Sequence, residues 1–62
     1  MRGIKVARTI KNMTQTELGN EMGVSLTTIS AWETGKYNPS VENLIKLSKV
    51  LDTSIDTLTK EV

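Results

Sequence analysis

Apolar side chains recur along the chain at intervals of three and four residues, which is the period of an α-helix. In the segment 2–11, Ile4 and Ala7 share one side of the predicted helix, and Val6 and Ile10 add a second apolar edge. The segment that follows Ser40 has a broader apolar face: Val41, Leu44, Ile45, Leu47, Val50 and Leu51. The spacing predicts an all-α fold of five helices with no strand.

Residues that cap helices mark the boundaries of these five elements. Thr14 and Glu17 are spaced as a capping box, and Met13 and Leu18 lie at the positions of a hydrophobic staple. The other predicted N-caps are Ser25, Ser40 and Ser54, and the predicted stops are Asn12, Gly23 and Gly35. The last helix should turn Ile55 and Leu58 inward.

The second and third predicted helices have apolar faces that must meet across a short turn. Leu18 and Met22 are four residues apart and share a face of the second helix. Ile29 and Trp32 are three residues apart and share a face of the third. Since its spacing suits this face, we expect Trp32 to be a core or rim residue rather than a base-stacking one.

Two glycines suggest how closely these helices approach each other. Gly19 lies on the inner side of the second helix, where a side chain larger than alanine would hold the helices apart. Glycine inside a helix costs about 1 kcal/mol relative to alanine, so its presence suggests a packing requirement. Gly23 permits a sharp reversal of the chain. Together these features predict a helix-turn-helix, the alternative being an ordinary helical hairpin with incidental glycines.

A longer set of residues extends this motif over nearly the whole chain. It comprises Thr14-Gln15-X-X-Leu18-Gly19, Gly23-Val24-Ser25, Thr28-Ile29-Ser30-Ala31-Trp32-Glu33-X-Gly35-Lys36, Asn38-Pro39-Ser40 and the helix from Leu44 to Leu51. This set resembles the Xre family, the Cro and phage-repressor type of helix-turn-helix regulator. The resemblance implies that residues 1–62 form a single five-helix, lambda-repressor-like DNA-binding domain.

The resemblance also implies which residues would contact DNA. The base-reading positions correspond to Leu26, Thr27, Ser30 and Ala31. The positions that contact the DNA backbone correspond to Gln15, Ser25, Thr34, Lys36 and Asn38. Independently of the resemblance, we expect Tyr37 to be exposed in the loop, near a phosphate. The family glutamine also buttresses the third helix, and a helix start suits phosphate because its amide groups are free.

Leu26 and Thr27 depart from many relatives, which have arginine, glutamine or another long polar residue at these positions. Leucine cannot form the bidentate contact that arginine makes with guanine. Leu26, Ala31 and the Thr27 methyl group could instead touch thymine methyl groups, so we expect T-rich contacted positions. The alternative is that Leu26 packs on the protein or on a partner chain.

Arg8 and Glu33 match a pair of family residues that form a salt bridge between helices. We expect the same structural pairing here. A catalytic role for Glu33 has little support, because no second carboxylate or histidine stands at a matching spacing.

Composition excludes several other kinds of protein. The chain has 62 residues with no Cys and no His, so neither a disulfide nor a zinc site is expected, and no metal or cofactor. Without these residues and without a Gly-rich phosphate loop, an enzyme is not expected. No apolar run is long enough to span a bilayer, so we expect a soluble intracellular protein. The family resemblance implies the cytoplasm of a bacterial or phage-infected cell.

The charges are unevenly distributed, although the net charge is only +1. Residues 1–12 contain four basic side chains, Arg2, Lys5, Arg8 and Lys11, and no acidic one. This end of the chain is either a phosphate-facing side or simply a solvated helix face, and the sequence favours neither.

The predicted function is sequence-specific binding of double-stranded DNA by a transcriptional regulator, a repressor, acting as a homodimer on a pseudo-palindromic operator. Two chains are expected because one small, weakly charged domain should bind a half-site weakly. The candidate dimer residues are Leu51, Ile55, Leu58 and Val62, which could equally close the core of one chain. No small-molecule effector is expected within this chain. The alternative is a protein-interaction or antitoxin-like module that keeps the fold.

Overall fold

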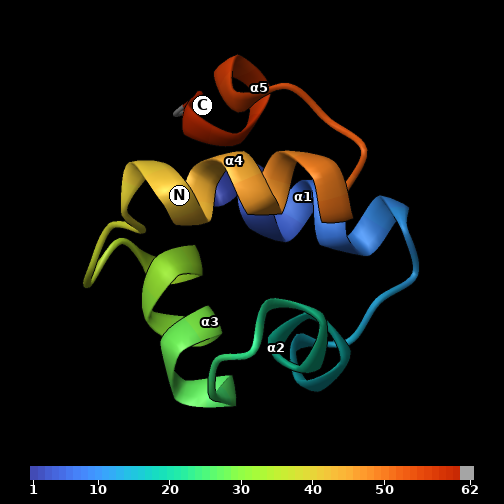
Figure 1. The fold of residues 1–62 in the computed structure, drawn as a ribbon, viewed down its shortest axis with the longest axis vertical. Helices are drawn as coiled ribbons and strands as arrows, with labels where there is room; N and C mark the ends of the chain where they lie inside the picture. Colours follow the sequence, from blue (N-terminus) through green and yellow to red (C-terminus); the bar gives the residue numbers. More distant parts are fainter. Residues whose placement is uncertain (61–62) are drawn as a thin grey trace.

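Five α-helices account for most of residues 1–60, the part of the chain that the computed structural model describes (Figure 1). They are α1 (Arg2–Ile10), α2 (Gln15–Met22), α3 (Leu26–Thr34), α4 (Val41–Val50) and α5 (Ile55–Thr59). No strand occurs within these residues, which confirms the all-α prediction. The first helix ends one residue earlier than predicted, and Asn12 follows it with a φ of 58°, as its role of stop requires.

The helix starts are held by the predicted caps. Thr14 Oγ1 accepts a hydrogen bond from the Glu17 amide at 3.0 Å, and Glu17 Oε1 accepts one from the Thr14 amide at 2.9 Å. This completes the capping box at the start of α2. The predicted serine caps of the later helices are also present, at Ser25, Ser40 and Ser54.

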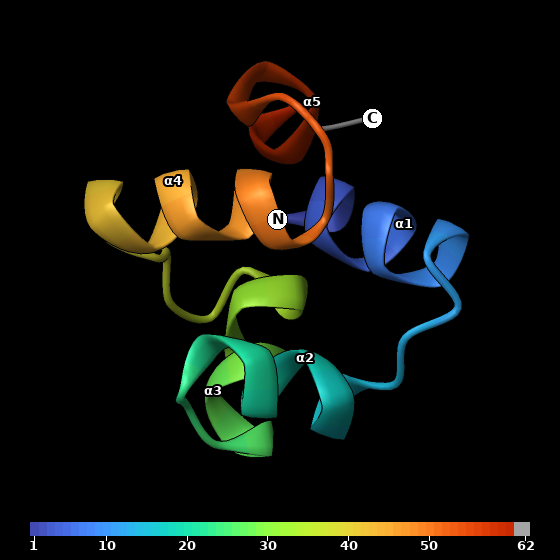
Figure 2. The same cartoon turned by 45° about the vertical axis from the view of Figure 1, so that its right-hand side comes forward.

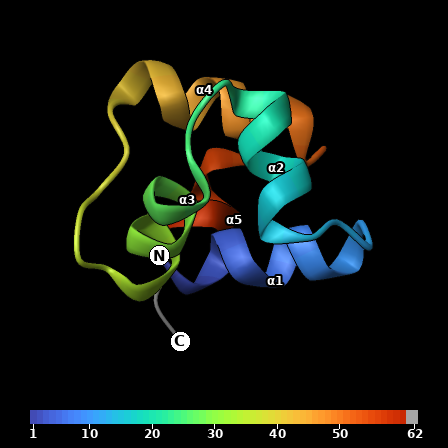
Figure 3. The same cartoon turned by 90° about the horizontal axis from the view of Figure 1, so that it is seen from below.

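The helices are arranged around one core, which is mostly aliphatic and contains a single aromatic residue, Trp32. The pair α2 and α3 lies at one end of the molecule, and α5 packs on α1 and α4 at the other end (Figures 1 and 2). In Figure 3, α1 runs crosswise to α2, beside the start of that helix. The buried core residues are Ile4, Ala7, Leu18, Met22, Ile29, Trp32, Leu47, Leu51 and Leu58.

This core corrects part of the predicted dimer surface. Leu51 and Leu58 are buried within the chain, because α5 folds back over α1 and α4, so they close the core of one chain. Ile55 is exposed and remains available to a partner, whereas Val62 lies outside the described residues. The predicted apolar faces were also too broad, since Val6, Ile10, Val41 and Ile45 are exposed.

Gly19 and Gly3 both lie where two backbones approach closely. A Cβ atom on Gly19 would lie 2.8 Å from the Val24 carbonyl oxygen, which confirms that this glycine lets α2 and α3 pack together. A Cβ atom on Gly3 would lie only 2.3 Å from the Thr57 carbonyl oxygen. No local pattern in the sequence indicates this second approach, which allows α1 to contact α5.

Candidate nucleic-acid interface

The first half of α3 presents a set of uncharged side chains to solvent. Leu26 is 49% exposed, Thr27 is exposed, and Ser30 is partly exposed. Residues three and four positions apart lie on the same side of a helix, so Ser30 continues the surface that Leu26 and Thr27 begin. This face offers methyl groups and hydroxyl groups without formal charge.

Ala31 does not belong to this exposed face. Its side chain is only 8% exposed, although it follows the exposed Thr27 by four residues. Its backbone carbonyl accepts hydrogen bonds from the amides of Gly35 and Lys36, so it also helps to end the helix. The burial of Ala31 therefore contradicts the prediction that it contacts bases. The candidate base-reading residues that remain are Leu26, Thr27 and Ser30.

The start of α3 is fixed by its own cap. Ser25 Oγ accepts a hydrogen bond from the Thr28 amide at 3.2 Å, and its hydroxyl group also lies 3.0 Å from the Thr28 hydroxyl group. The amide groups of the first helical turn point out of the helix and have no intrahelical partner. Such a helix start attracts anionic groups, including phosphate.

A buried carboxylate joins α3 to α1 and α2. Glu33 Oε2 accepts a hydrogen bond from Arg8 Nε at 2.6 Å, and Glu33 Oε1 accepts one from Arg8 Nη2 at 3.3 Å. The same Oε1 accepts a hydrogen bond from Gln15 Nε2 at 2.9 Å. Arg8 Nη1 also donates to the Met13 carbonyl at 2.7 Å. The expected Arg8–Glu33 pair is thus present, and its side chains are 12% and 2% exposed respectively.

The bond between Gln15 and Glu33 was not predicted, although a buttressing role for Gln15 was. The two residues are 18 positions apart, so no local spacing in the sequence indicates their contact. Because Gln15 stands at the start of α2 and Glu33 near the end of α3, the bond fixes one helix of the motif relative to the other. A phosphate contact by Gln15 would use the second hydrogen of its amide nitrogen.

The end of α3 and the loop that follows it are exposed at Thr34, Lys36, Tyr37 and Asn38. Thr34 Oγ1 donates to the Ser30 carbonyl at 3.0 Å, so its hydroxyl group is held against the end of α3. Lys36 and Asn38 are exposed, and Lys36 Nζ lies 5.8 Å from the centre of the exposed Tyr37 ring. Lys36 supplies a positive charge next to a helix that has no Lys or Arg of its own.

No group of three or more His, Cys, Asp or Glu side chains within residues 1–60 could hold a metal ion. In the same part of the chain, no helix is both long enough and apolar enough to cross a membrane.

Comparison with known proteins identifies the same motif. A helix-turn-helix family model matches residues 4–58. The cryptic phage CTXphi transcriptional repressor RstR of Vibrio cholerae is 43% identical over 47 residues, which are 76% of this chain and 42% of RstR. The HTH-type transcriptional activator BcrR of Enterococcus faecalis is 47% identical over 51 residues, which are 82% of this chain and 25% of BcrR.

A third relative comes from a phage. Repressor protein C2 of Salmonella phage P22 is 42% identical over 57 residues, which are 92% of this chain and 26% of that protein. This chain therefore spans less than half the length of each of these three relatives. No solved structure matches it.

Proposed function

This chain belongs to the Xre-type helix-turn-helix family, and on that premise we propose that it binds double-stranded DNA in a sequence-specific manner and represses transcription. The observation that carries the proposal is the exposed, uncharged face of α3 formed by Leu26, Thr27 and Ser30. A helix of this kind fits the major groove, where each base pair presents a distinct pattern of chemical groups.

The chemistry of this face supports a preference for thymine. Leu26 and the Thr27 methyl group are suited to apolar contact with the thymine C5-methyl group, and the hydroxyl groups of Thr27 and Ser30 can donate or accept. The first-turn amides of α3, together with Gln15, Ser25, Thr34, Lys36 and Asn38, would bind phosphates and set the register of the helix. Base contacts would then specify the sequence and phosphate contacts would position the protein.

Two copies of the chain would bind one operator in this proposal. A single domain with one α3 helix contacts few base pairs, and a net charge of +1 provides little attraction to phosphates. A two-fold dimer would place its α3 helices about 34 Å apart, one turn of DNA, and would select a pseudo-palindrome. Of the predicted dimer residues that the structure describes, Ile55 is the one left exposed.

Selection of binding sites from a random pool of DNA duplexes at fixed salt tests this function. We expect enrichment of two inverted half-sites about one helical turn apart, with T·A pairs at the contacted positions. We also expect the affinity for the selected duplex to fall steeply as the salt concentration rises, because phosphate contacts release counterions. No duplex binding at low salt would contradict the proposal and would favour the protein-interaction or antitoxin-like module.

Leu26→Arg tests whether α3 reads bases at its first position. We expect the selected base at the Leu26 contact to change from thymine toward guanine, because arginine donates two hydrogen bonds to guanine O6 and N7. A good bidentate contact discriminates between bases by about 1–3 kcal/mol, which a repeated selection would resolve. Val41→Arg adds the same charge on an exposed position of α4 and should leave the selected sequence unchanged. An unchanged sequence with Leu26→Arg as well would show that Leu26 does not face the groove.

A further inference from the structure

The outer face of α1 carries two exposed apolar side chains that the core does not use. Ile10 is 75% exposed and Val6 is about half exposed. They are four residues apart, so they lie one helical turn from each other on the same side of α1. Exposed apolar side chains that adjoin one another can mark a site of interaction.

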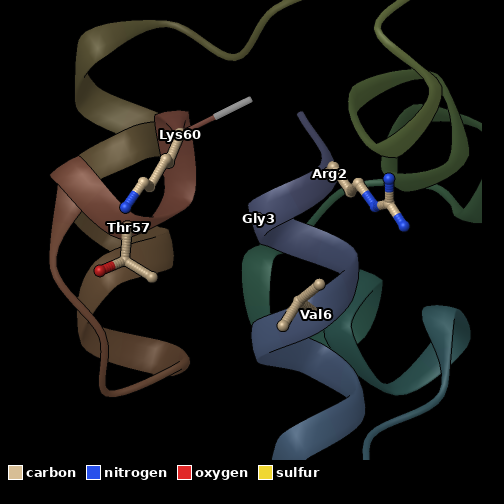
Figure 4. A pocket seen from close by; sticks show the side chains of 5 residues that line it. All are labelled: Arg2, Gly3, Val6, Thr57 and Lys60. Atoms are coloured by element: carbon tan, nitrogen blue, oxygen red, sulfur yellow. The ribbon is translucent and has the colours of Figure 1, made fainter. Parts of the chain in front are cut away.

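Two hollows adjoin Val6 and extend this face. One hollow, of about 330 Å³, lies between α1 and α5 and is lined by Arg2, Gly3, Val6, Thr57 and Lys60 (Figure 4). The other, of about 300 Å³, follows α1 and is lined by Arg2, Lys5, Val6, Thr9 and Ile10. Because Val6 lines both, the two hollows form one surface along α1, which we call the α1 groove.

The charges of the α1 groove have one sign. Among residues 1–60, the charged side chains that line the two hollows are those of Arg2, Lys5 and Lys60, and no carboxylate of this part of the chain lines either hollow. Lys5 and Lys60 are exposed, so their ammonium groups can reach a partner at the edge of the groove. Apolar anchor points bordered by positive charge are complementary to apolar side chains bordered by negative charge.

The α1 groove extends along α1 to α5. The helix α5 lies at one end of the molecule, and the first turn of α3 lies at the other end. Figure 1 shows α5 at that far end, with α1 and α4 between it and the pair of α2 and α3. A partner bound between α1 and α5 would therefore leave the exposed face of Leu26, Thr27 and Ser30 open.

We propose that the α1 groove binds an acidic amphipathic helix of a partner protein. Two apolar side chains one turn apart would enter the hollows beside Val6 and Ile10, and neighbouring Glu or Asp side chains would face Lys5 and Lys60. The charge also argues against a second copy of this chain as the occupant. A two-fold dimer through this face would place one positively charged groove against another.

Titration of the full chain with a synthetic helical peptide tests the proposal without DNA. The probe has leucines four residues apart on one face and glutamates around them, and its binding is followed by chemical-shift mapping. We expect saturable binding with the largest shifts at Val6, Ile10 and Thr57. A peptide with lysines in place of the glutamates should bind at least about tenfold more weakly, because like charges then meet.

Ile10→Ser is the variant that separates this groove from other exposed surfaces. It should weaken binding of the acidic peptide at least about tenfold, because it removes one of the two exposed apolar side chains of the α1 groove. Val41→Ser is the matched control, since Val41 is 72% exposed on α4, and it should bind as the unchanged chain does. Thermal unfolding of both variants should match that of the unchanged chain, because both side chains are largely exposed.

Several outcomes would overturn the proposal. They are equal binding of the acidic and basic peptides, equal binding by Ile10→Ser, or no binding at about millimolar peptide, the weak end of measurable affinities. Sedimentation that shows self-association lost in Ile10→Ser would instead identify a second copy as the occupant. The peptide titration contains no DNA, so its result stands even if the chain does not bind a DNA duplex.

Discussion

Replacing Glu33 with alanine is expected to lower the free energy of unfolding by about 3–5 kcal/mol, because it leaves a largely buried arginine without its partner. Glu33 accepts hydrogen bonds from both Arg8 and Gln15, and the Arg8 side chain is only 12% exposed. After the substitution, the Arg8 guanidinium group loses both of its hydrogen bonds to Glu33 while its side chain stays largely buried between α1 and α3. Urea denaturation monitored by Trp32 fluorescence would measure the loss.

Two further variants make this test specific. Glu21→Ala removes an exposed carboxylate from α2 and should change stability by no more than about 0.5 kcal/mol. Arg8→Met should also lower the melting temperature, because it strands the Glu33 carboxylate, while the selected DNA sequence stays the same. If Glu33→Ala and Arg8→Met were as stable as the unchanged chain, the ion pair would have no structural role.

Replacing Gly3 with alanine is expected to destabilise the protein by about 1–3 kcal/mol, the usual range for an overpacked contact. The added Cβ atom would lie 2.3 Å from the Thr57 carbonyl oxygen and 2.5 Å from the Leu58 carbonyl oxygen. Both obstacles are backbone atoms of α5, so α5 must move and pull the buried Leu58 out of position. Alanine favours a helix over glycine by about 1 kcal/mol, and the expected loss of stability is what remains after this contribution is subtracted.

Lys5→Ala provides the control on the same helix. Lys5 is exposed, so its truncation should change stability by at most about 0.5 kcal/mol. Thermal unfolding of the two variants under one set of conditions would compare them directly. A Gly3→Ala protein more stable than the unchanged chain would mean that α1 and α5 do not pack as closely as the structure has them.

The parts of the fold that depend on neighbouring residues were predictable from the sequence. The capping box of Thr14 and Glu17 acts over three residues, and the positive φ of Gly23 is a property of its own backbone. Gly19 was also predictable, because the turn that follows it dictates which backbone it approaches. The Arg8–Glu33 pair was expected only from family resemblance, and the structure contains it.

The parts that depend on how distant segments meet were not predictable. Nothing near Gly3 in the sequence indicates that α5 returns to it, more than fifty residues later. The same return of α5 buries Leu51 and Leu58, which spacing alone cannot distinguish from a dimer surface. For the candidate site, resemblance placed Ala31 among the base-reading residues, but its side chain is buried in the folded chain.

The residues that hold α3 in place through hydrogen bonds differ from the residues that α3 exposes to solvent. Glu33, Gln15 and the Ser25 cap hold the helix in place, whereas Leu26, Thr27 and Ser30 form its outer face. A domain this small has little stability to lose, and most substitutions that disturb a core lower it. Substitutions on the outer face leave the contacts of Glu33 and Gln15 in place. Under the proposed function, single substitutions there would change the DNA sequence that α3 selects while the domain stays folded. The same separation makes the domain a suitable scaffold for selecting altered DNA specificity in the laboratory.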